Sequence, residues 1–77
     1  MYFGEIMDMT WKKLAPYKKV YYDAHSGLIF GIVLTNVSDG TAMAFYNDKS
    51  IGDYISEDTA KYAVQNRHLG EMMEPPL

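Results

Sequence analysis

The sequence predicts a small α+β domain with the order helix, three-stranded antiparallel meander, helix (αβββα), in which both helices pack on the sheet. Three observations lead to this fold class. Apolar residues recur every three or four positions near both ends of the chain, they alternate with polar residues in the middle, and glycine-containing turns divide the middle into short segments. The first spacing follows one face of a helix and the second follows one face of a strand.

A first helix is expected over residues 3–14. Its apolar stripe consists of Phe3, Ile6, Met7, Thr10, Trp11 and Leu14. Pro16 ends this helix, because the residue before a proline avoids the helical conformation.

Three strands are expected over residues 17–24, 28–37 and 41–46. The sequence His25-Ser26-Gly27 supplies the first turn, and Asp39-Gly40 supplies the second. The middle strand has apolar residues on both faces, so we expect it to be central. Within it, Gly31 indicates a bulge or a point where a helix packs closely on the sheet.

A polar loop is expected over residues 47–53, followed by a helix with Ser56 as its N-cap and Gly70 as its stop. The predicted domain therefore spans residues 1–70. Residues 71–77 are expected to form a flexible C-terminal tail, because Pro75 and Pro76 cannot continue a helix.

The composition indicates a folded cytoplasmic protein. Hydrophobic residues make up 48% of the 77 residues, which is too many for a disordered chain, and no apolar segment is long enough to cross a membrane. The absence of cysteine excludes disulfides and thiolate metal sites. A chain this short buries a thin core, which favours association with a partner subunit.

No constellation of residues predicts catalysis, a metal or a cofactor. His25 and His68 are far apart in the sequence and have no metal-ligand spacing. His25 and Ser26 are adjacent in a turn, where a base and a nucleophile seldom point at each other. No glycine-rich loop leads into Lys-Ser or Lys-Thr, so a phosphate loop is not expected.

Charge is distributed unevenly along the chain. Residues 1–46 are neutral overall, and residues 47–77 carry the whole net charge of −3. Four lysines interleaved with aromatic residues offer one alternative function, nucleic-acid binding, and they are Lys12, Lys13, Lys18 and Lys19. Four acidic residues offer another, mimicry of a phosphate backbone that blocks a DNA-binding protein, and they are Asp48, Asp53, Glu57 and Asp58.

The predicted order of elements, with His25 in the first strand turn and Thr59-Ala60-Lys61 entering the last helix, resembles the double-stranded RNA-binding fold in topology. That family presents lysines at the start of its final helix to hold phosphates, whereas this sequence has Glu57 and Asp58 there. We therefore interpret the resemblance as one of layer architecture.

Protein binding is the preferred function. If both predicted helices cover one sheet face, the other face exposes an apolar patch formed by Tyr21, Ile29, Val33, Met43 and Phe45. If the helices lie on different faces, no patch remains. We predict a non-enzymatic protein-binding domain, a homodimer formed across the second sheet face or an edge strand. Such a domain would suit an accessory regulator or inhibitor that occupies a partner's surface, as many virus- or mobile-element-encoded proteins do.

Overall fold

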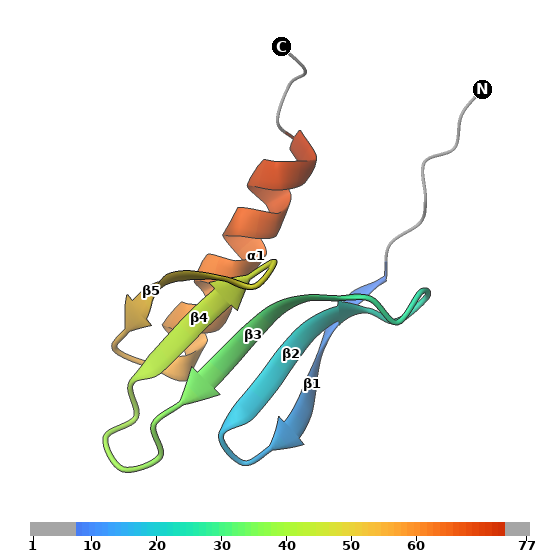
Figure 1. Ribbon diagram of the computed structural model, residues 1–77. Coiled ribbons are helices and arrows are strands. Elements are labelled where there is room, and N and C mark those ends of the chain that lie inside the picture. The colour runs from blue at the N-terminus through green and yellow to red at the C-terminus, as the bar shows by residue number, and fades with distance from the viewer. Residues whose placement is uncertain (1–7, 74–77) are drawn as a thin grey trace, which may run out of the picture.

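The computed structural model describes residues 8–73 and contains a single antiparallel sheet followed by a helix (Figure 1). The elements are β1 (Met9–Ala15), β2 (Lys18–Asp23), β3 (Ile29–Thr35), β4 (Ala42–Tyr46), β5 (Lys49–Tyr54) and α1 (Glu57–Met73). The five strands lie side by side in chain order, so every strand pairs with its neighbour in the sequence. The predicted fold, three strands between two helices, is therefore wrong.

The first correction concerns the expected helix over residues 3–14, because β1 occupies residues 9–15. β1 pairs with β2 so that Met9 lies opposite Asp23 and Trp11 lies opposite Tyr21. The Trp11 and Tyr21 rings are 4.8 Å apart, a cross-strand aromatic contact that stabilises the sheet and outweighs a weak helical pattern. Residues 3–7 of the expected helix lie outside the described residues.

The second correction concerns the expected loop over residues 47–53, most of which is β5. Asn47 and Asp48 have φ angles of 51° and 66°, the left-handed conformation that a two-residue hairpin turn requires. This turn reverses the chain directly from β4 into β5. With five strands and with β1 in place of a first helix, the topology also differs from that of the double-stranded RNA-binding fold.

The middle of the prediction is confirmed. β2, β3 and β4 form the expected antiparallel meander, with β3 at its centre. Gly40 in the expected β3–β4 turn has a φ of 80°, a conformation that glycine adopts without a steric penalty.

The helix begins where expected and ends later than expected. The backbone N–H of Thr59 donates to Ser56 Oγ at 3.2 Å, which is the predicted N-cap. α1 then continues through Gly70 to Met73, so residues 71–73 of the expected tail are helical. Residues 74–77 lie outside the described residues. Within residues 8–73 there is no helix with the length and apolar character needed to cross a bilayer.

α1 covers one face of the sheet, which we call the helix face (Figure 1). The core lies between them and consists mainly of small residues, namely Val33, Ala42, Ala44, Ala60 and Val64 together with Tyr21 and Tyr46. Gly31 lies directly beneath Val64, so the expected close approach of a helix is confirmed, whereas the bulge in β3 falls on the neighbouring Phe30. Small side chains on both partners allow the helix to approach the sheet closely.

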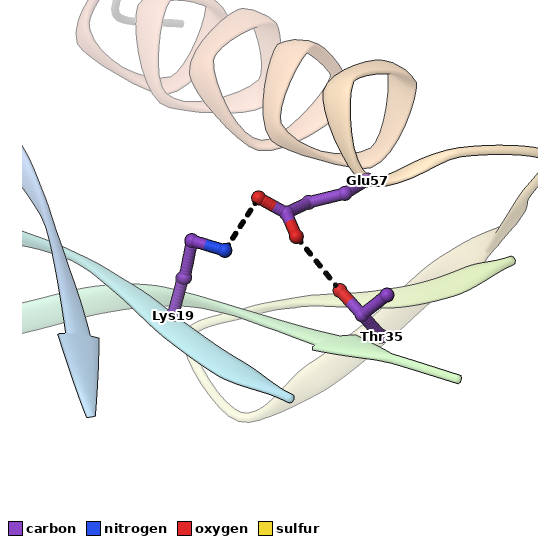
Figure 2. A network of polar contacts seen from close by, with 3 residues as sticks. All are labelled: Lys19, Thr35 and Glu57. Atoms are coloured by element: carbon purple, nitrogen blue, oxygen red, sulfur yellow. Dashed lines mark hydrogen bonds and ion pairs between the residues drawn. The ribbon is translucent and has the colours of Figure 1, made fainter. Parts of the chain in front are cut away.

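A polar network fixes the first turn of α1 to the middle of the sheet. Figure 2 shows the Lys19 ammonium 2.7 Å from one carboxylate oxygen of Glu57, while the Thr35 hydroxyl donates to the other at 3.2 Å. About a quarter of each charged side chain is exposed. The hydrogen bond from Lys19 is the main cause that lowers the pKa of the Glu57 carboxyl.

Candidate interaction surface on the open sheet face

The face of the sheet opposite α1, which we call the open face, is the strongest candidate for a functional surface. Side chains alternate between the two faces along each strand, so the neighbours of the buried residues Val33 and Ala44 point to the open face. Within residues 8–73, α1 packs on β3, β4 and β5 from the helix face alone, and no other helix or strand lies over the open face.

Strand pairing arranges the open-face residues in two rows. The first row crosses from β2 to β5 and consists of Lys18, Leu34, Met43 and Asp53. The second row crosses from β1 to β5 and consists of Lys12, Val20, Ile32, Phe45 and Ser50. Because paired residues in an antiparallel sheet lie close together on the same face, each row is a continuous strip of side chains. The centre of the face is apolar and its two flanks are polar.

The open face is hollowed between its charged flanks. A groove of about 240 Å³ is lined by Lys18, Ile32, Leu34, Phe45 and Asp48. A larger hollow of about 560 Å³ also includes Leu34 and continues past Met43 and Asp53 to the end of the sheet. Three aliphatic or aromatic side chains therefore form the floor of the groove, and one lysine and one aspartate stand at its margins.

The predicted protein-binding residues do not form one surface. Tyr21 and Val33 are buried beneath α1, with exposed fractions of 8% and 0%, so a partner cannot reach them in the folded domain. Met43 and Phe45 lie on the open face, where Met43 is 45% exposed and Phe45 is half-buried. Ile29 is exposed at the start of β3. Partner binding by Met43 and Phe45 stays a prediction.

The sequence interpretation missed Ile32 and Leu34 as members of the open face. Val20 also points to this face but is only 2% exposed. One signal in the sequence indicates which face a helix covers. Glycine and alanine recur on one face of β3 and β4, whereas Ile32, Leu34, Met43 and Phe45 occupy the other. A closely packed helix requires the side with small residues, and this leaves the large residues uncovered.

The four lysines of the nucleic-acid hypothesis are divided between the two faces. Lys13 and Lys19 lie opposite each other in the register of β1 and β2, on the helix face, and Lys19 forms an ion pair with Glu57. Lys12 and Lys18 lie on the open face, where the Lys12 ammonium is 6.0 Å from the centre of the Tyr22 ring. The four cations therefore do not converge on one surface.

The four acidic residues are divided in a similar way. Asp48 and Asp53 border the hollows of the open face. Glu57 and Asp58 lie in the first turn of α1, where the helix dipole favours negative charge. Glu57 also forms an ion pair with Lys19. Only the first two thus contribute to the candidate surface.

The two histidines lie in different environments. His25 is exposed, and the neighbouring Ser26 hydroxyl donates to Asp23 at 2.9 Å, so this hydroxyl is engaged in shaping the turn. His68 is buried, its Nδ1 is hydrogen-bonded to the Tyr46 hydroxyl at 2.7 Å, and burial lowers the pKa of its imidazole. Across residues 8–73, no three His, Asp or Glu side chains gather closely enough to hold a metal ion.

Comparison with known proteins gives no relative from which a function could be transferred. No protein-family model, no curated protein and no solved structure matches this chain. The open face itself is therefore the basis for assigning a function.

Proposed function

We propose that this chain is a protein-binding domain that docks a partner on the open face of its sheet and acts as an accessory regulator or inhibitor by occupying the partner's surface. The observation that carries this proposal is the apolar groove floored by Ile32, Leu34 and Phe45 between Lys18 and Asp48. An apolar centre with a polar rim is the usual composition of a protein interface.

The energetics favour a protein as the occupant. Each apolar Å² removed from water contributes about 25 cal/mol, and the groove offers large side chains that the domain itself leaves partly in solvent. A nucleic acid would require converging cations, whereas Lys13 and Lys19 lie on the opposite face from Lys12 and Lys18. The distribution of the lysines therefore supports nucleic-acid binding less well than the groove supports protein binding.

The test compares two baits that differ from the wild-type chain by one exposed apolar residue. Met43→Lys places a charge on the open face, and Leu69→Lys places the same charge on α1, where Leu69 is 54% exposed. Both variants should keep the circular dichroism spectrum of the wild type, since neither side chain belongs to the buried core.

We expect at least one protein from the native host to be retained by the wild-type and Leu69→Lys baits and lost from the Met43→Lys bait. The purified pair should then bind by calorimetry, with an affinity at least about 10-fold weaker for Met43→Lys, since one desolvated interface charge costs about 1.4 kcal/mol or more. Equal retention by both variant baits would overturn the proposal, and so would the absence of any protein retained by the wild type.

A further inference from the structure

We propose that the occupant of the open face is a second copy of this chain, packed face to face about a twofold axis that runs parallel to the strands. This inference rests on the proposed function, because it names the partner of the same surface. It is carried by the order of charges across the first row of the open face.

That row begins with a cation and ends with an anion. Lys18 lies on β2 and Asp53 on β5, with Leu34 and Met43 between them on β3 and β4. The ion pairs found among the described residues involve neither Lys18 nor Asp53. The row therefore presents opposite charges at its two ends and an apolar pair at its centre.

A twofold axis between β3 and β4, parallel to the strands, makes this row complementary to itself. The rotation places β2 of one copy over β5 of the other and β3 over β4. Lys18 then faces Asp53 of the second copy, Leu34 faces its Met43, and the symmetry repeats both contacts. Two ion pairs enclose an apolar centre in this arrangement.

The second row fits the same axis. Ile32 of one copy faces Phe45 of the other, and Ser50 lies over the position of Val20, which is only 2% exposed and adds little contact, so no charge is placed against an apolar side chain at the centre. Lys12 on β1 falls outside the overlap and keeps its contact with the Tyr22 ring. Sheets packed in this way are about 10 Å apart with strands inclined by about 30°.

Charge also selects between the possible axes. An axis perpendicular to the strands would place β2 over β2 and β5 over β5. Wherever that axis crosses the strands, Lys18 then faces residues of β2 and Asp53 faces residues of β5, so neither charge meets an opposite charge on the open face. The axis parallel to the strands is therefore the one that the charges favour.

The area of the open face determines how tightly two copies are expected to associate. Four strands spaced about 4.8 Å apart and about five residues long give a footprint of about 300 Å² per copy. Even with the roughness of side chains this lies below the roughly 800 Å² per partner of a standard interface. We therefore expect a dimer that forms in a concentration-dependent equilibrium, with a dissociation constant of about 10 to 100 µM.

The experiment is sedimentation equilibrium of the purified full chain up to about 1 mM, well above the expected dissociation constant. The wild type should dimerise, and Lys18→Asp and Asp53→Lys should each dimerise at least about 10-fold more weakly, because each reversal creates two repulsive pairs per dimer. Lys13→Asp and Asp58→Lys are the matched controls. Both residues are exposed away from the open face, and these variants should dimerise like the wild type.

Mixing the two charge-reversal variants tests the proposed pairing of Lys18 with Asp53 most directly. In an equimolar mixture of the Lys18→Asp and Asp53→Lys variants, every facing pair regains opposite charges, so a heterodimer should form at wild-type affinity. A wild type that remains monomeric throughout, single variants that dimerise like the wild type, or a mixture that stays monomeric would overturn the inference. A monomeric wild type whose open face still retains another protein refutes the second copy and leaves the proposed function standing.

Discussion

Gly31 allows α1 to lie close to the sheet, and replacing it with alanine tests that packing directly. A Cβ atom at residue 31 would overlap Val64 Cγ1 and would come within 3.4 Å of the Phe45 carbonyl oxygen and of Tyr21 Cβ. Val64 is completely buried, so its methyl group cannot move into solvent to make room. The helix, the strand or both must shift.

The expected cost follows from that overlap. Forcing an extra methyl group into a packed core costs about 1 to 3 kcal/mol. In a domain of this size each kcal/mol lowers the melting temperature by about 4 to 8 °C, so Gly31→Ala should melt about 5 to 20 °C below the wild type. Urea unfolding followed by circular dichroism, together with a thermal scan, measures both quantities.

A second substitution separates steric overlap from other effects of removing glycine. Val64→Ala alone should cost about 2 to 3 kcal/mol, through lost burial and the cavity that it leaves. In the double variant the new methyl group at residue 31 occupies that space, so it should be no less stable than Val64→Ala alone. Additive losses within about 0.5 kcal/mol would refute the reasoning, because they would show that residues 31 and 64 do not compete for the same volume.

Two further predictions concern polar groups that tie the helix to the sheet. Because burial lowers the pKa of His68 below its ordinary value of 6.5, the unfolded chain binds a proton more readily, and the free energy of unfolding should fall as the pH drops below 6.5. Chemical denaturation across this range should show a weaker dependence of the unfolding free energy on pH in His68→Gln than in the wild type, and an equal dependence in the two proteins would contradict the assignment. The second prediction concerns the ion pair in Figure 2, for which a double-mutant cycle with Lys19→Met and Glu57→Gln should give a coupling energy of about 0.5 to 1 kcal/mol. This coupling energy should decrease with added salt. No coupling at low salt would show that the pair does not stabilise the fold.

The central meander was predictable because local chemistry determines it. Alternating residues and an Asp39-Gly40 turn leave few other structures for β3 and β4, and a serine N-cap followed by two acidic residues marks the start of α1. These signals act within a few residues of one another. They need no information about the rest of the chain.

The edges of the sheet were harder to predict, because their structure depends on tertiary contacts. Trp11 fits both the expected helical stripe and a two-residue alternation with Met9, and only the pairing of β1 with β2 decides between them. β5 contains Gly52 and few apolar residues, so its strand character comes from its ladder with β4. The Asn47-Asp48 turn was a signal for this hairpin that the sequence interpretation did not use.

Only part of the candidate surface could be located from the sequence. The sequence shows that the central strand is apolar on both faces, so that either face could be the uncovered one. The face on which the helix packs depends on the small residues opposite Val64. A bulge at Phe30 also breaks the simple alternation of β3. Residues could therefore be assigned to one face of the sheet only once the strand register was known, and a single sequence does not supply that register.

The order of strands in the sheet, identical to their order in the chain, has a consequence for how the protein is made. Each hairpin can close as soon as its two strands have left the ribosome, because no strand waits for a distant partner, and such local pairing favours rapid folding. The helix face is different, since α1 is synthesised after all five strands. Until α1 has been made, Val33, Ala42 and Ala44 stay in water, and we expect the nascent sheet to be a client for chaperones during that interval.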